Sequence, residues 1–206
     1  IAVDNLMTFD GSVLFSIAES TLEPGLIWTG SNDGQVQLTK DGGQNWRKVA
    51  RITGVPERTY VNAVFASKHD EKVVYACFNN HKNGDFKPYV YISRDKGTTW
   101  RNISSTLPER GSVYAIEEDH IDPKLLFVGT EFGVFFSDNQ GGEWKQLKGG
   151  MPTIAVRDIA IQEEHNDLVL GTFGRGFYVL DDYSSLRGIS PSLNSEATLF
   201  GVRDAL

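Results

Sequence analysis

An eight-residue pattern that occurs three times constrains this chain more than any other feature of its sequence. The pattern is (S/T)-x-(D/N)-x-G-x-x-W, and its copies end at Trp46, Trp100 and Trp144, 54 and then 44 residues apart. Recurrence at a spacing of roughly 40 to 50 residues is typical of repeat architectures, in which each unit packs against its neighbours. The fold is therefore expected to consist of several copies of one small unit.

The defined positions of the octet suit a tight structural turn. An Asp or Asn side chain accepts hydrogen bonds from N–H groups of its own turn, a Gly two positions later permits positive φ, and the opening hydroxyl adds another bond. The Trp ring is expected to pack on the hairpin as a buried anchor. We predict a structural role, and no catalytic or metal-binding one, because side chains on separate units cannot converge. The residues are Thr39, Asp41, Gly43, Trp46, Ser93, Asp95, Gly97, Trp100, Ser137, Asn139, Gly141 and Trp144.

Short apolar segments recur around the octets. Each unit opens on an alternating apolar segment and continues with an apolar run that ends on a small residue. The alternations are 14–18, 61–66, 113–116 and 156–161, and the runs end at Gly30, Cys77, Gly129 and Gly171, in steps of 47, 52 and 42 residues. Runs of Val, Ile, Phe, Tyr and Thr broken by Gly, Asp and Asn indicate strands and hairpins, and no segment has the period of an amphipathic helix.

A unit of this length with four short strands predicts a blade of a β-propeller. We expect an all-β fold with four four-stranded blades over residues 12–182, at about 12–55, 56–107, 108–151 and 152–182, and flanking segments 1–11 and 183–206. The fourth unit lacks the octet, since no Trp follows Leu180-Asp-Asp. The sequence starts at Ile1 without an initiator methionine, so we expect part of a larger propeller of six to ten blades, with a closed four-bladed ring as the alternative.

Alternating strands in a blade predict which residues share a face. The octets lie with the first hairpin turns, and the opposite face collects the second hairpin turns and the connections between units. The segment Asn79–Lys87 is expected to form a long loop there, and loops on a rigid scaffold often carry function. Each polar residue of this face is either a ligand contact or an ordinary solvated turn residue. The ligand-binding candidates are Asp33, Arg58, His81, Asp85, Lys87, Arg110, Glu131 and Arg175.

Composition excludes several classes of protein. The net charge is −7 with scattered Lys and Arg, which argues against a nucleic-acid partner. Cys77 is the only cysteine, so an internal disulfide is impossible, and we predict no metal and no cofactor. No apolar run approaches the roughly 20 residues of a membrane span, so the chain is not expected to be membrane-embedded. If the blades form an open arc, its exposed ends favour self-association.

The octets and three longer segments carry a family resemblance. Residues 26–46, 85–91 and 171–182 resemble BNR/Asp-box repeat propellers, and more narrowly the bacterial sortilin-like proteins classed as glycosyl hydrolases. The resemblance implies a fragment of a sortilin-like propeller that acts as a binding scaffold for a peptide, protein or glycan. It also implies an extracytoplasmic location: secreted, periplasmic or at the cell surface.

The alternative that the resemblance implies is an exported glycoside hydrolase, of which this chain is a non-catalytic or half-site portion. Glycoside hydrolysis needs a pair of carboxyl groups on either side of the scissile bond, and no spacing in the sequence identifies such a pair. Sialidases with these boxes need an arginine triad, a Tyr–Glu pair and an Arg-Ile-Pro stretch near the start, and Arg51-Ile-Thr53 is not that stretch. We therefore expect no activity from this chain alone and predict no catalytic residue.

Overall fold

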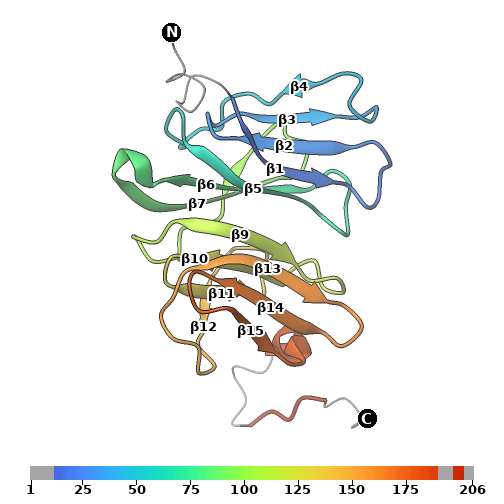
Figure 1. Ribbon diagram of the computed structural model, residues 1–206. Coiled ribbons are helices and arrows are strands. Elements are labelled where there is room, and N and C mark those ends of the chain that lie inside the picture. Colours follow the sequence, from blue (N-terminus) through green and yellow to red (C-terminus); the bar gives the residue numbers. More distant parts are fainter. Residues whose placement is uncertain (1–11, 190–196, 202–206) are drawn as a thin grey trace.

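The computed structural model describes residues 12–189 and 197–201, which form four antiparallel β-sheets in chain order (Figure 1). The first sheet contains β1 (Leu14–Glu19), β2 (Ile27–Ser31), β3 (Val36–Thr39) and β4 (Arg47–Lys48). The second contains β5 (Tyr60–Ala66), β6 (Val74–Asn80), β7 (Asp85–Ser93) and β8 (Arg101–Asn102). The third contains β9 (Val113–Glu118), β10 (Leu126–Thr130), β11 (Gly133–Ser137) and β12 (Lys145–Leu147). The fourth contains β13 (Val156–Gln162), β14 (Asp167–Thr172) and β15 (Phe177–Leu180).

The strands follow the repeat pattern of the sequence. The four apolar alternations form β1, β5, β9 and β13, each of which is an edge strand of its sheet. The fourth sheet has three described strands, which agrees with the loss of the octet after Leu180. Two short 3-10 helices, η2 (His81–Asn83) and η3 (Tyr183–Gly188), complete the described elements. The flanking segment predicted at 1–11 lies outside the described residues.

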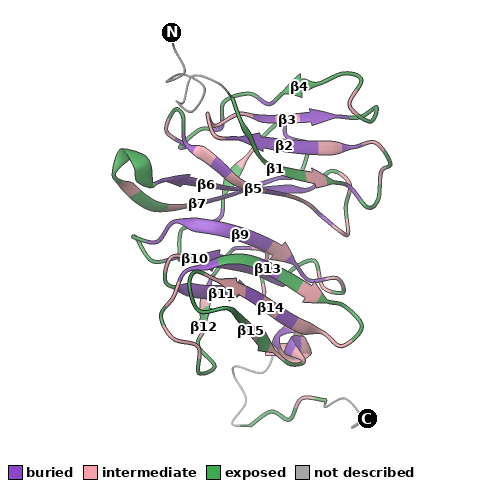
Figure 2. Cartoon of the chain, viewed as in Figure 1, coloured by how far each residue is buried: buried purple, intermediate pink, exposed green. Residues whose placement is uncertain are grey.

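The four sheets form an open arc around their first strands. β1 packs on β5, β5 on β9 and β9 on β13, whereas β13 and β1 make no comparable contact. Figure 1 shows the first sheet (blue) and the fourth (orange) at opposite ends of the stack. Both ends carry exposed apolar side chains, such as Ile17 at 70% and Phe177 at 79% exposure, and no residue of β15 is buried (Figure 2).

Separate apolar cores lie between successive sheets. One core joins the first and second sheets, another the second and third, and another the third and fourth. Two of the small residues that recur in the sequence let neighbouring sheets approach. A Cβ on Gly30 would lie 2.4 Å from Cγ1 of Val61, and one on Gly129 would lie 2.6 Å from the carbonyl oxygen of Val156. Any larger side chain there would force the blades apart.

The three octets share one hydrogen-bond pattern. The opening hydroxyl donates to the Asp or Asn side chain and accepts from the N–H of the glycine, whose φ is positive. The same Asp or Asn oxygen accepts the backbone N–H four residues later, at 2.8 Å in every copy. All these bonds lie within the turn, so the octet closes its hairpin from its own residues.

The three octet tryptophans differ in burial, which corrects the expectation that each ring is a buried anchor. Trp144 is 5% exposed, and its Nε1 donates to the Ile103 carbonyl of the preceding sheet at 2.6 Å. Trp100 is half-buried and Trp46 is 45% exposed, and both donate to the glycine carbonyl of their own octet. The octet pattern determines the turn, whereas the neighbouring sheet determines whether the ring is covered.

The beginning of the predicted flanking segment 183–206 is part of the core. Tyr183 and Leu186 of η3 are buried among the apolar residues of the third and fourth sheets. The Tyr183 ring meets that of Phe127 edge-on at 5.1 Å. Arg187 forms a two-pronged ion pair with the fully buried Asp119, which also accepts a hydrogen bond from the Tyr183 hydroxyl. This short helix therefore fastens the fourth sheet to the third.

Candidate binding face

The two faces of the arc are distinguished by their hydrogen bonds. In each of the first three sheets an octet turn donates to the turn that joins the first two strands: Gly42 N to Gly25 O, Lys96 N to Lys72 O, and Gln140 N to Lys124 O. The opposite face carries the turns after β2, β6, β10 and β14 and the connections between sheets. Four concavities open along that face, so we describe it as the candidate binding face.

Each first strand contains a β-bulge at the equivalent position near this face. The register shifts between Leu14 and Ser16 in β1, and the same two-residue step recurs in β5, β9 and β13. The residues left unpaired by the bulges are Phe15, Asn62, Tyr114 and Arg157. A bulge bends the strand and redirects one side chain, and bulges are common beside functional sites. The sequence did not predict these bulges, because a bulge adds one residue to a strand and requires no distinctive residue type.

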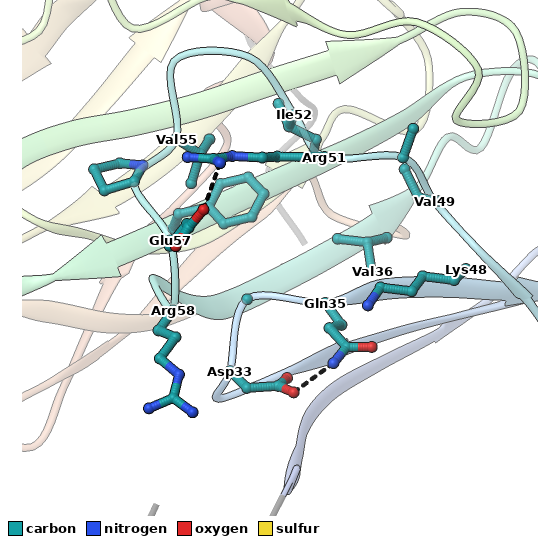
Figure 3. Close-up of a pocket in the computed structure, with 14 residues that line it drawn as sticks. Asp33, Gln35, Val36, Lys48, Val49, Arg51, Ile52, Val55, Glu57 and Arg58 are labelled. Carbon is teal, nitrogen blue, oxygen red and sulfur yellow. Dashed lines mark hydrogen bonds and ion pairs between the residues drawn. The ribbon is translucent and has the colours of Figure 1, made fainter. Parts of the chain in front are cut away.

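The first concavity lies between the first and second sheets and has a volume of about 280 Å³ (Figure 3). Asp33 and Arg58, both predicted candidates, line it. Arg58 has φ of 56°, a strained value for a residue with a side chain, and Figure 3 shows it pointing away from the Arg51–Glu57 ion pair. Partial burial opposes ionisation of Asp33, but hydrogen bonds from Ser31, Ser12 and Gln35 outweigh it and lower the pKa of this carboxyl.

The predicted long loop Asn79–Lys87 is mostly an extended hairpin. β6 continues to Asn80 and β7 begins at Asp85, so only η2 and Gly84 lie between the strands. The Asp85 carboxylate accepts hydrogen bonds from Tyr89 at 2.6 Å and Asn80 at 3.1 Å, and these outweigh the effect of burial and lower the pKa of Asp85. Asp85 and Lys87 border a shallow concavity of about 720 Å³ at the outer side of this hairpin.

A further concavity, of about 580 Å³, lies between the second and third sheets. It brings together three predicted candidates, His81, Arg110 and Glu131, which come from three separate segments. Tyr114, at the bulge of β9, donates its hydroxyl to the Glu131 carboxylate. Burial, with a further contribution from Glu131, raises the pKa of Tyr114 to about 12, so the phenol stays protonated at neutral pH. We call this concavity the blade 2–3 pocket.

Seven of the eight predicted candidates therefore line concavities of one face. Arg175 is exposed in the turn between β14 and β15 and lines none of these four. The list of candidates did not include several other residues that line these concavities: Tyr60, Lys82, Phe86, Ser112, Tyr114, Phe132 and Arg157. For the aromatic residues among them, the sequence signal was an aromatic side chain inside or next to an apolar alternation. Such a residue, taken alone, is typical of a core position.

Glu117 is the described carboxyl group whose pKa rises to about 7. Burial raises it, and the Lys68 ammonium at 3.1 Å lowers it less. A carboxyl group that titrates near neutrality can act as a general acid. Glu117 lies toward the octet end of β9, however, where Lys68 also pairs with Glu163 at 2.8 Å. Glu117 lines none of the concavities described above, so we interpret it as part of an ion-pair network between blades.

Comparison with known proteins identifies the fold and leaves the family open. No protein-family model matches this sequence, and no curated protein matches it. Many solved structures match the chain in three dimensions. A GH74 xyloglucanase from Xanthomonas campestris is similar over 84% of this chain and 30% of its own, with a TM-score of 0.64 at 10% identity. These enzymes are β-propellers larger than the four sheets described here.

The chain has a β-propeller fold.

Two other solved structures match this chain with similar TM-scores. YCF48 bound to D1 peptide matches 84% of this chain and 52% of its own, with a TM-score of 0.62 at 14% identity. The extracellular domain of BT4673 from B. thetaiotaomicron matches 86% of this chain and 22% of its own, with a TM-score of 0.63 at 15% identity. This propeller arc thus spans about half or less of these three chains. No helix in the described part of the arc has the length and hydropathy to cross a lipid bilayer.

Proposed function

We propose that this propeller arc is a binding module that holds a protein or peptide segment across the candidate binding face. The observation that carries the proposal is the placement of four concavities on one face of the scaffold. Exposed rings of Phe86 and Phe132 lie beside Arg110 there, and aromatic and arginine side chains are enriched where proteins bind one another. The structural similarity to YCF48, which binds a D1 peptide, supports the same reading.

The alternative is that this chain is a portion of a glycoside hydrolase, and the structural similarity to the GH74 xyloglucanase favours it. Such an enzyme needs one carboxyl group that stays protonated at working pH opposite a second that is ionised. On the candidate binding face, hydrogen bonds lower the pKa of both Asp33 and Asp85, so neither is suited to be the acid. Asp33, Asp85 and Glu131 also line different concavities. This arrangement supports binding over hydrolysis.

Binding to arrays of random peptides and of glycans that include xyloglucan tests the proposal. We expect wild-type protein to bind peptides, and the double substitution Arg58→Ala with Arg110→Ala to weaken that binding about tenfold or more. The matched control is Lys40→Ala with Lys72→Ala, which removes the same charge from exposed positions on the octet face. Binding to glycans alone, or release of reducing ends from xyloglucan, would favour the hydrolase alternative.

The narrower family relation and the compartment belong to the same proposal. The octet geometry supports a BNR/Asp-box, sortilin-like propeller, because each copy closes its own turn in the same way. An extracytoplasmic location is supported by the similarity to the extracellular domain of BT4673.

We also propose that two copies of this chain associate through the ends of the arc. In a closed propeller every sheet packs on two others, whereas here Leu14 and Ile17 at one end, and Phe177 and Val179 at the other, are all more than half exposed. Exposed apolar patches on this scale favour association. Light scattering at increasing concentration should show a dimer of about twice 22.9 kDa. A strict monomer at high concentration would contradict this.

A further inference from the structure

The blade 2–3 pocket contains an arginine whose guanidinium lies over an aromatic ring. Arg157 is the bulge residue of β13, and its guanidinium carbon lies 3.6 Å from the centre of the Tyr114 ring. Phe173 lies on the same guanidinium, at 5.2 Å. Stacking of this kind restricts the side chain while it leaves the N–H groups at the edge of the guanidinium accessible.

No described carboxylate lies within ion-pair distance of this guanidinium. The same holds for Arg110, which lies over the Phe86 ring at 5.5 Å and lines the same pocket. The Glu131 carboxylate is in the pocket too, but it accepts the Tyr114 hydroxyl. Two arginines thus border one concavity with donors to spare, although the chain as a whole carries a net charge of −7.

We propose that Arg157 and Arg110 bind a carboxylate group of a peptide in the blade 2–3 pocket. The neighbouring side chain of that peptide packs on Phe86 and Phe132, which are 42% and 43% exposed. A planar guanidinium matches a carboxylate with two parallel hydrogen bonds, and the stacked ring orients it in advance. The carboxylate belongs either to an Asp or Glu side chain or to the end of a chain. This inference rests on the proposed peptide-binding function.

Three sets of fluorescently labelled dodecapeptides test it by anisotropy. One set is amidated and carries Phe-Glu at its centre, the next replaces Glu with Gln, and the last carries Gln and ends in Phe with a free carboxylate. We expect one of the two carboxylate sets to bind wild-type protein about tenfold more tightly than the amidated Gln set. Whichever set binds identifies the source of the carboxylate.

Substitutions at Arg157 assign the effect to the pocket. Arg157→Gln should abolish the tenfold preference, and Arg157→Lys should restore only part of it, because an ammonium keeps the charge but not the planar, stacked fork. Both variants should fold normally, since Arg157 is exposed; circular dichroism and the melting temperature check this. Arg175→Gln is the control of equal charge on the same face, and it should change affinity less than twofold.

The outcomes separate this inference from the proposed function. Equal binding of all three sets to wild-type protein would overturn carboxylate recognition and leave peptide binding standing. An unchanged preference in Arg157→Gln, or an equal loss in Arg175→Gln, would overturn the assignment to this pocket. Failure of every peptide set to bind, or binding of polygalacturonate instead, would overturn both.

Discussion

Replacing Asp119 with alanine is expected to lower the free energy of unfolding by about 3–5 kcal/mol. Asp119 is fully buried between the third sheet and η3, and it accepts hydrogen bonds from Arg187 at 2.7 and 2.8 Å and from the Tyr183 hydroxyl at 2.5 Å. Alanine would remove the carboxylate that accepts hydrogen bonds from a partly buried guanidinium and a buried phenol, and would leave Arg187 with its hydrogen bond to Asn166. Urea unfolding at pH 7 measures the loss.

A serine substitution at position 119 separates the contribution of the ion pair from that of the hydrogen bonds in the turn. Asp119 also accepts the N–H groups of Ile121 and Asp122, just as Ser67 accepts those of the two equivalent residues in the preceding blade. The free energy of unfolding of Asp119→Ser should therefore be about 1 kcal/mol higher than that of Asp119→Ala. Asp122→Ala, at a half-buried position of the same turn, is the control and should cost much less than either. Equal stabilities of all three variants would contradict the role assigned to Asp119.

The same carboxylate should give the protein a specific dependence on acid. Burial opposes its ionisation, but hydrogen bonds from Arg187 and Tyr183 outweigh this and lower the pKa of Asp119 to about 2, from a usual 3.8. The folded-state pKa lies below the unfolded one, so this stabilisation is present above pH 3.8 and is lost as pH falls toward 2. The difference in unfolding free energy between wild type and Asp119→Ser should shrink over that range.

Trp144→Ala is expected to cost about 3–5 kcal/mol, as truncation of large buried aromatic residues does. Its ring packs in the core between the second and third sheets, and its N–H is bonded to Ile103 of the neighbouring blade. The change would leave a cavity at a blade interface and an unpaired carbonyl. Urea unfolding measures the loss of free energy of unfolding, and the slope of that free energy against urea concentration should be the same as in the wild type.

Trp46→Ala is the matched control for Trp144→Ala. It removes the same side chain from the same octet position, but there the ring is 45% exposed and bonded only to its own turn. We expect a cost of about 1 kcal/mol or less, with half-buried Trp100→Ala between the two. Similar costs at Trp46 and Trp144 would show that the turn, and not the neighbouring blade, gives the tryptophan its effect.

The sequence by itself determined the repeated unit, because strands and turns depend on neighbouring residues. Alternation of apolar residues located β1, β5, β9 and β13, and the octet positions located turns whose hydrogen bonds close within eight residues. The position of Asp33 and Glu131 on one face also followed, since strand direction alternates along the chain. These features need no knowledge of which blade packs on which.

Tertiary structure alone decided the features that depend on contacts between blades. Tyr114 and Arg157 lie 43 positions apart and meet only because two bulges occur at equivalent places in adjacent strands. Trp46 and Trp144 occupy identical octet positions, yet only Trp144 is covered by a neighbouring blade. Asp119, unlike the equivalent Ser67, also binds Tyr183 and Arg187, because η3 packs against it. Burial and pairing across the interface are properties of the assembled sheets, so the local pattern of residues does not contain them.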